Sequence, residues 1–163
     1  MNEERNVIKT NAIIFFDRNV KSSELSNLLT NFEGDIIING MLYFDEEITI
    51  KCDNLFATVV VSDEVPVNII GNLYTKRDIS AYDVKVNGSV YCGADLNSPE
   101  IQVAEDLCVN GDIDSICGCI EVGGNCICNG KVKNACFMGI GDNFKGTVAV
   151  TNADILVDIC IGN

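Results

Sequence analysis

Cysteines are the residues whose type and spacing come closest to a chemical site in this sequence. There are nine of them in 163 residues. Five lie close together as two Cys-x-Cys pairs and one more: Cys117, Cys119, Cys126, Cys128 and Cys136. Thiolates at such spacing can bind zinc, hold an iron–sulfur cluster or form a disulfide, for which Cys117 and Cys136 are the best placed pair.

A structural role explains the same cysteines without a ligand. Free cysteine behaves as a small hydrophobic residue and is among the most buried residue types. Cys92, Cys126 and Cys128 fall at apolar positions of a sequence repeat, which favours a place in the core. We therefore expect reduced thiols with no metal and no cofactor, and a metal site or a disulfide are the alternatives.

Histidine is absent from the chain, and this excludes several enzyme classes. Acyltransferases that use a histidine base and carbonic anhydrases that hold a metal with three histidines are both ruled out. The sequence also lacks a phosphate-binding loop, a calcium-binding Gly-rich repeat and a serine in a nucleophile elbow. We expect a protein that is not an enzyme. A carbohydrate-active enzyme with convergent carboxylates is a further alternative.

The charge of the chain is strongly negative, with 24 acidic and 11 basic residues and a formal net charge of −13. Such a charge repels phosphate backbones and anionic membranes, so we expect no direct nucleic-acid binding and no membrane association. The longest apolar runs, 13–16 and 57–61, fall far short of the roughly 20 residues that span a bilayer. No export signal is visible at the amino terminus, so we expect a cytoplasmic protein.

A repeat of about six residues runs from Ile36 to the end of the chain. The repeat has 22 apolar anchor residues separated by 21 steps, and 16 of these steps are six residues long. If three successive steps make one coil, four of the other five steps fall at the same corner of that coil. Half of the anchors, 11 of 22, follow an Asp or Asn. These residue types favour corners, because their side chains bond the nearby backbone and tolerate left-handed φ.

Grouping the anchors by threes gives three stacked faces. The first begins at Ile48, Val67, Val84, Ile101, Ile120, Met138 and Ile155. The second begins at Ile36, Leu55, Leu73, Val90, Leu107, Cys126, Phe144 and Ile161. The third begins at Leu42, Val61, Ile79, Leu96, Ile113, Val132 and Val150.

The position two after each anchor should also point inward, because side chains of a strand alternate. On the first face this gives an unbroken aliphatic column: Ile50, Ile69, Val86, Val103, Val122, Ile140 and Val157. We therefore predict an all-β, single-stranded parallel β-helix over residues 35–163, with three short strands and about 17–19 residues per coil, in about seven coils. An antiparallel sandwich, the main alternative, would place its turns at irregular spacing without such columns.

Residues 1–34 have a different pattern, which predicts a cap over the first coil. An apolar stretch indicates a strand around 12–16. Leu25, Leu28, Leu29 and Phe32 lie on one side of a short amphipathic helix near 23–32.

The residue one after each anchor should face solvent, and on the second face this position is apolar. It is occupied by Ile37, Phe56, Tyr74, Tyr91, Cys108 and Ile127. The corresponding positions of the other two faces are mostly polar, for example Lys85 and Gln102 on the first and Ser62 and Asp114 on the third. Stacked in line, the six residues would form an apolar strip about 25 Å long. Either the amino-terminal helix covers part of it or a second copy of the chain does.

The repeating unit, clearest in residues 101–115 and 120–134, resembles bactofilins, which are bacterial polymer-forming cytoskeletal proteins. Their pattern of a glycine followed by one residue and an aliphatic recurs, for example in Gly71-Asn-Leu, Gly88-Ser-Val and Gly130-Lys-Val. The resemblance covers roughly residues 35–163 and implies a right-handed, roughly triangular β-helix that can stack end to end. The steps of five and seven residues favour the same hand.

Together these features lead us to expect a structural or scaffolding homo-oligomer. The apolar strip and an open carboxy-terminal coil, with Val157 and Ile159 on its last strand, are the candidate contacts. The alternative is an acidic solenoid that imitates nucleic acid and binds a protein partner.

Overall fold

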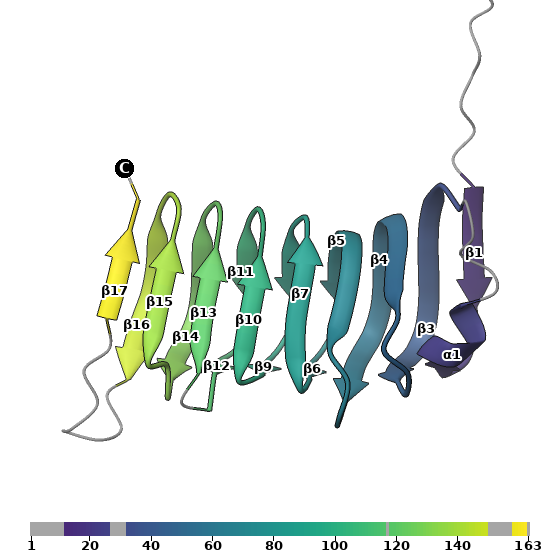
Figure 1. Cartoon of the computed structure of the whole chain (residues 1–163), viewed down its shortest axis with the longest axis horizontal. Coiled ribbons are helices and arrows are strands. Elements are labelled where there is room, and N and C mark those ends of the chain that lie inside the picture. The colour runs from purple at the N-terminus through teal and green to yellow at the C-terminus, as the bar shows by residue number, and fades with distance from the viewer. Residues whose placement is uncertain (1–11, 27–31, 117, 150–157, 163) are drawn as a thin grey trace, which may run out of the picture.

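The chain winds into a parallel β-solenoid of about eight turns, each with three strand positions. The structure is a computed structural model, and it describes residues 12–26, 32–116, 118–149 and 158–162. Successive coils stack along the long axis of the molecule, and their strands lie side by side (Figure 1). The predicted single-stranded parallel β-helix is therefore confirmed.

Face two, the second face of the repeat, carries a ladder of eight paired strands. It contains β1 (Ala12–Phe16), β3 (Gly34–Phe44), β4 (Thr49–Ser62), β5 (Val67–Thr75), β8 (Val90–Cys92), β11 (Leu107–Val109), β14 (Cys126–Lys133) and β16 (Phe144–Ala149). The predicted anchors from Ile36 to Phe144 pair in this order and recur every 17 to 19 residues, which confirms the coil length.

Faces one and three are built from shorter strands. Face one combines the starts of β4 and β5 with β7 (Asp83–Asn87), β10 (Glu100–Val103), β13 (Cys119–Val122), β15 (Phe137–Ile140) and β17 (Asp158–Ile161). Face three combines β2 (Val20–Lys21) and the ends of β3, β4, β14 and β16 with β6 (Ile79–Ser80), β9 (Leu96–Asn97) and β12 (Ile113–Asp114). The α-helix α1 (Ser22–Leu25) lies at the amino-terminal end, beside β3 (Figure 1).

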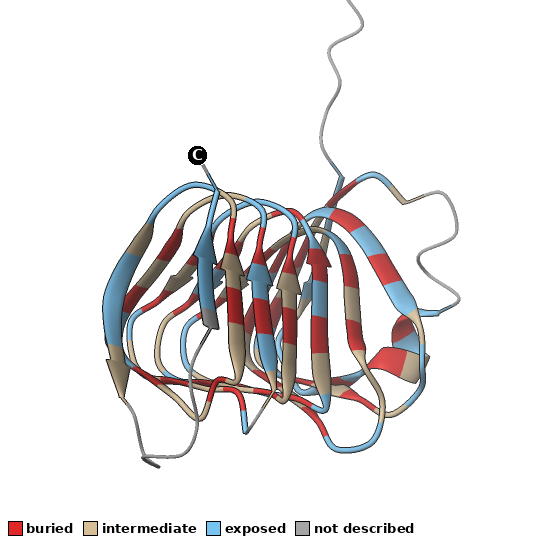
Figure 2. Ribbon diagram, turned by 60° about the vertical axis from the view of Figure 1, so that its left-hand side comes forward, coloured by how far each residue is buried: buried red, intermediate tan, exposed pale blue. Residues whose placement is uncertain are grey.

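The core is a set of aliphatic columns inside the coils. Ile50, Ile69, Val86, Val103, Val122 and Ile140 are all buried, as the alternation predicts. Buried and exposed residues alternate along the strands in Figure 2. Each fully buried aliphatic side chain contributes roughly 1.5–3 kcal/mol of transfer free energy, so these columns are the main source of stability.

Polar side chains stack at the corners and join one coil to the next. The side-chain amide of Asn54 donates to the Asp35 carboxylate at 2.9 Å, and that of Asn72 donates to Asn54 at 3.1 Å. At another corner the backbone N–H of Asp112 donates to the Asp95 carboxylate at 2.8 Å. The predicted corner role of the Asp and Asn residues is thus confirmed at these positions.

Two anchors of face three were misplaced. Val148, and not Val150, pairs with the anchor Val132, and Val150 lies outside the described residues. The other, Val61, was predicted one residue too late. Val60, with no exposed surface, pairs with Leu42 and with Ile79, whereas Val61 pairs with Ser80 and is half-buried. As a result Ser62 is buried, and its hydroxyl donates to the carbonyl of Val65. Three consecutive valines, 59–61, offer no alternation from which the inward residue can be read.

The last strand was also predicted in the wrong position. Met138 pairs with Ile159, and Ile140 pairs with Ile161, so Ile161 lies on face one and not on face two. The residues predicted for the inner positions of this strand, Ile155 and Val157, lie outside the described residues. The prediction assumed a step of five or six residues there, but the connection between β16 and β17 is longer.

The amino-terminal strand is where it was predicted, but it is part of the ladder. β1 pairs in parallel with β3, so that Ile14 lies opposite Ile36, and Val20 of β2 lies opposite Leu42. This explains why there are about eight turns and not seven. The described helix, Ser22–Leu25, covers only the start of the predicted range, and residues 27–31 lie outside the described part of the chain.

Candidate functional site

An apolar row follows the outer surface of face two across seven coils. Its members pair with one another in succession: Phe15, Ile37, Phe56, Tyr74, Tyr91, Cys108 and Ile127. The last six are the residues predicted from the sequence. Phe15 was missed, because β1 was not recognised as part of a coil. Lys145 pairs with Ile127 and ends the row at the carboxy-terminal side.

Three residues of the apolar row are exposed to solvent, and Ile37, Tyr74, Cys108 and Ile127 are half-buried. Phe15 is 59% exposed, Tyr91 41% and Phe56 37%. The rings of Phe56 and Tyr74 stack with centroids 4.9 Å apart and planes 15° apart. A groove of about 630 Å³ runs along the amino-terminal half of the row and is bordered by Lys76 and other residues of the next row. A large contiguous apolar patch exposed to water commonly marks an interaction site.

Two polar rows flank the apolar row, and we call the three rows together the lateral surface. One flank is Ile13, Asp35, Asn54, Asn72, Ser89, Asp106, Asn125 and Asn143. The other is Asp17, Asn39, Thr58, Lys76, Gly93, Asn110 and Asn129. Thr147 does not continue it, because a register shift between β14 and β16 places Thr147 opposite Lys131. With Lys145 counted as its last position, the lateral surface has three carboxylates and two ammonium groups and a net charge of −1, whereas the whole chain has −13.

The described part of the amino-terminal helix does not cover the apolar row. Leu25 has no exposed surface and is packed in the core with Val20 and Leu42, and α1 contacts β2 and β3 at the end of the solenoid (Figure 1). Phe32 is half-buried and also packs against the core. Leu28 and Leu29 lie outside the described residues.

The last described strand, β17, has one edge without a partner among the described strands. β17 pairs with β15 along one edge, and no other described strand pairs with it. Ile159 is 39% exposed and Ile161 52%. Val157, the other predicted contact at this end, lies outside the described residues. The free edge offers backbone groups that another strand can pair with.

The cysteines are dispersed over core and surface. Cys92, Cys126 and Cys128 are buried, Cys108 and Cys136 half-buried, and Cys119 exposed. Burial raises the pKa of Cys126 to about 12 and also raises that of Cys128. Free thiols are found at Cys52, Cys92, Cys108, Cys119, Cys126, Cys128 and Cys160, and no group of three or more metal-ligating side chains occurs among the described residues. Cys117 lies outside them, so its predicted pairing with Cys136 is not tested.

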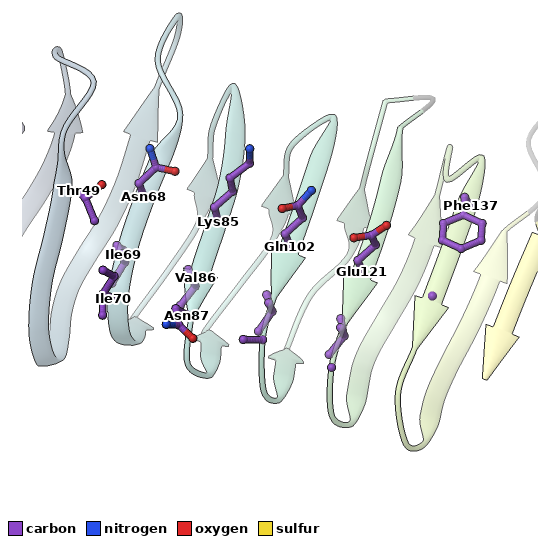
Figure 3. Close-up of a pocket in the computed structure, with 15 residues that line it drawn as sticks. Thr49, Asn68, Ile69, Ile70, Lys85, Val86, Asn87, Gln102, Glu121 and Phe137 are labelled. Atoms are coloured by element: carbon purple, nitrogen blue, oxygen red, sulfur yellow. The ribbon is translucent and has the colours of Figure 1, made fainter. Parts of the chain in front are cut away.

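Face one carries a polar row along an open depression of about 880 Å³. Asn68, Lys85, Gln102 and Glu121 follow one another on adjacent strands and project from the same side (Figure 3). At the starts of β7 and β10, Asp83 and Glu100 are paired on adjacent coils. Burial and the Glu100 carboxylate raise the pKa of Asp83, while Lys85 opposes them. This carboxylate pair was not predicted from the sequence.

A scan against protein-family models, a search of curated proteins and a search of solved structures each found no match to this chain. Among the described residues there is no helix that is both long and apolar enough to cross a membrane.

Proposed function

We propose that this chain is a non-enzymatic structural or scaffolding protein that self-associates through its lateral surface. The exposed apolar row on face two is the observation that carries the proposal. Burial of the exposed parts of Phe15, Phe56 and Tyr91 against a second copy would remove apolar surface from water at about 25 cal/mol per Å².

A bactofilin-like cytoskeletal role is the specific form of this proposal. It is supported by the repeat that resembles those proteins and by the open edge of β17, where Ile159 lies. In this form the lateral surface joins chains side to side, and the ends add copies along the solenoid axis. Repeated heterologous contacts between two different ends generate an open filament.

An acidic module that binds a protein partner is the second candidate. The stacked Asp78, Asp95 and Asp112 are the feature that favours it. However, Asp78 and Asp95 each accept a hydrogen bond from a backbone N–H of the next coil, which is the role of a corner residue. We therefore rank this candidate after self-association.

Light scattering of the purified chain over a concentration series tests the proposal. The molar mass should rise with concentration for the parent and stay near that of the monomer for the double variant Tyr74→Glu with Tyr91→Glu. Two buried charges should weaken association about tenfold or more, because removing central aromatic residues of an interface commonly costs over 1 kcal/mol each.

The matched control is Ser80→Glu with Asn97→Glu, which adds the same two charges at the outward positions of the next face. This control should associate like the parent. A parent that is monomeric at every concentration contradicts self-association and favours the protein-binding module. Equal behaviour of both double variants would show that the lateral surface is not the contact.

A further inference from the structure

The geometry points to one orientation of the second copy: we infer that two chains dock antiparallel through their lateral surfaces. A two-fold axis then lies along the strand direction, between the coils of Tyr74 and Tyr91. The inference rests on the proposed self-association and specifies its geometry.

The apolar row fits this arrangement because a charged residue, Lys145, stands at only one of its two ends. With Lys145 included, the row has eight positions, so an antiparallel two-fold axis pairs the first position with the eighth, the second with the seventh and so on. Phe15 then meets Lys145 of the second copy, and Ile37 meets Ile127. Phe56 meets Cys108, and Tyr74 meets Tyr91.

Every apolar residue of the row therefore finds an apolar partner except Phe15, which receives the Lys145 side chain. An ammonium group near an aromatic ring is attractive. Asp17, which is exposed two residues after Phe15, lies in the neighbouring row and adds a carboxylate on the same side. The lysine of one copy thus meets an aromatic and acidic end of the other.

The flanking rows pair without conflict in the same orientation. Each flanking row meets its own equivalent in reverse order, so Asp35 faces Asn125 and Asp106 faces Asn54. Lys76 faces Gly93, where no side chain obstructs it. No two like charges are opposite each other across the interface.

In a parallel orientation of the two copies, unfavourable contacts would form at both ends of the lateral surface. Each residue of the apolar row would then meet its own equivalent, so Lys145 would face Lys145. The two flanking rows would meet each other, which sets Ile13 against Asp17. Like charges placed directly opposite are unfavourable, and an apolar residue against a carboxylate gives no hydrogen bond.

The area of the lateral surface indicates how tightly two copies can associate. Eight coils about 4.8 Å apart and three rows about 6.6 Å apart cover roughly 450 Å² per copy. The two copies together bury about 900 Å², which is below the 1,200–2,000 Å² of typical stable interfaces. The lateral pair is therefore a weak, concentration-dependent dimer.

Photo-crosslinking at Phe15 reports the orientation directly. Phe15 is replaced by the photoreactive p-benzoylphenylalanine, and ¹⁵N-labelled and unlabelled chains are mixed so that mass spectrometry identifies adducts between two copies. We expect adducts to the segment around Lys145. The same photoreactive residue in place of Tyr82, which is 51% exposed and lies off the lateral surface, is the control and should give none.

Exchange of the charges at Lys145 and Asp17 tests the orientation independently, with the dissociation constant of the dimer measured by sedimentation. Lys145→Asp and Asp17→Lys should each raise the dissociation constant about two- to fivefold, and the double variant should return close to the parent. Adducts joining Phe15 to the Phe15 region overturn the antiparallel orientation while leaving self-association intact. A chain that never dimerises in either experiment overturns the proposed function, and the orientation with it.

Discussion

The carboxylate of Asp45 accepts two hydrogen bonds from Ser23, one from its backbone N–H at 3.0 Å and one from its hydroxyl at 2.8 Å. The hydroxyl of Ser22, which is buried, also donates to Asp45. A helix of only four residues has little stability of its own. Asp45, just beyond the end of β3, therefore holds α1 against the second coil.

We expect Asp45→Ala to release α1 without unfolding the solenoid. Hydrogen exchange of the amides of 22–25 should become faster by about tenfold or more, whereas the amides of β5 should keep their protection. Glu46→Ala changes an exposed neighbouring carboxylate and is the matched control. Unchanged exchange in the Asp45 variant would contradict the anchoring role.

The same hydrogen bonds make the attachment of α1 dependent on pH. The bond from the Ser23 backbone, opposed in part by desolvation and aided by the two hydroxyls, holds the pKa of Asp45 below its ordinary value. The stabilisation is therefore complete above the ordinary carboxyl pKa and is lost as the pH falls through the lowered one. Exchange at 22–25, corrected for intrinsic rates, should rise below about pH 4 in the parent and stay flat in Asp45→Ala.

Thiol reactivity should divide the cysteines into two groups. Burial raises the pKa of Cys92, Cys126 and Cys128, so their thiolates are scarce and sterically protected. Iodoacetamide at pH 8 should modify the exposed Cys119 and Cys160 and spare these three in the folded protein. Peptide mass spectrometry measures this, and unfolding in guanidinium should make all five react.

Native mass spectrometry tests whether the purified chain holds a metal. We expect a mass equal to that of the polypeptide with reduced thiols. One equivalent of zinc or iron, or a loss of two mass units for a disulfide, would contradict this and favour a site that includes Cys117.

Gly71 should tolerate no side chain. Its φ is +131°, and an added Cβ would lie 2.1 Å from the backbone carbonyl oxygen of Cys52 on the preceding coil. We expect Gly71→Ala to lower the free energy of unfolding by about 1–3 kcal/mol, measured by denaturant titration. Gly139→Ala is the control, because its Cβ would meet only the Phe137 ring, at 3.1 Å. A smaller loss at Gly71 than at Gly139 would contradict the corner geometry.

The exposed edge of β17 should contribute to growth beyond the dimer. Ile159→Lys places a charge on the terminal strand, so sedimentation should show smaller assemblies while the lateral dimer persists. Ile70→Lys is matched in chemistry and exposure, 41% against 39%, but lies away from the end. Assembly that proceeds unchanged in Ile159→Lys would refute contact through this end.

The fold could be predicted from the sequence wherever apolar and polar residues alternate without interruption. The column from Ile50 to Ile140 and the row from Ile37 to Ile127 were both placed correctly, because the same alternation recurs at a similar spacing on every coil. Prediction failed where that support was missing. The valines at 59–61 do not alternate, and the long connection before Ile159 broke the count of six.

The lateral surface could be predicted only in part for a similar reason. Phe15 belongs to the apolar row, but Ile14 and Ile36 are 22 residues apart, so the regular step does not reach β1. The pairing of Asp83 with Glu100 also went unnoticed, since it depends on which two residues the stacking brings opposite each other. Contacts between adjacent coils depend on the exact pairing of their strands, and the residue type at a single position does not indicate that pairing.

Each coil pairs only with the coil before it and the coil after it, so the length of the solenoid can change in units of one coil. Removal of residues 84–100 would bring Ile101 opposite Val67, in the place that Val84 now holds. Every other column would keep its alignment, and the molecule would shorten by about 4.8 Å. Gain or loss of whole coils can therefore set the length of this protein without redesign of its interior.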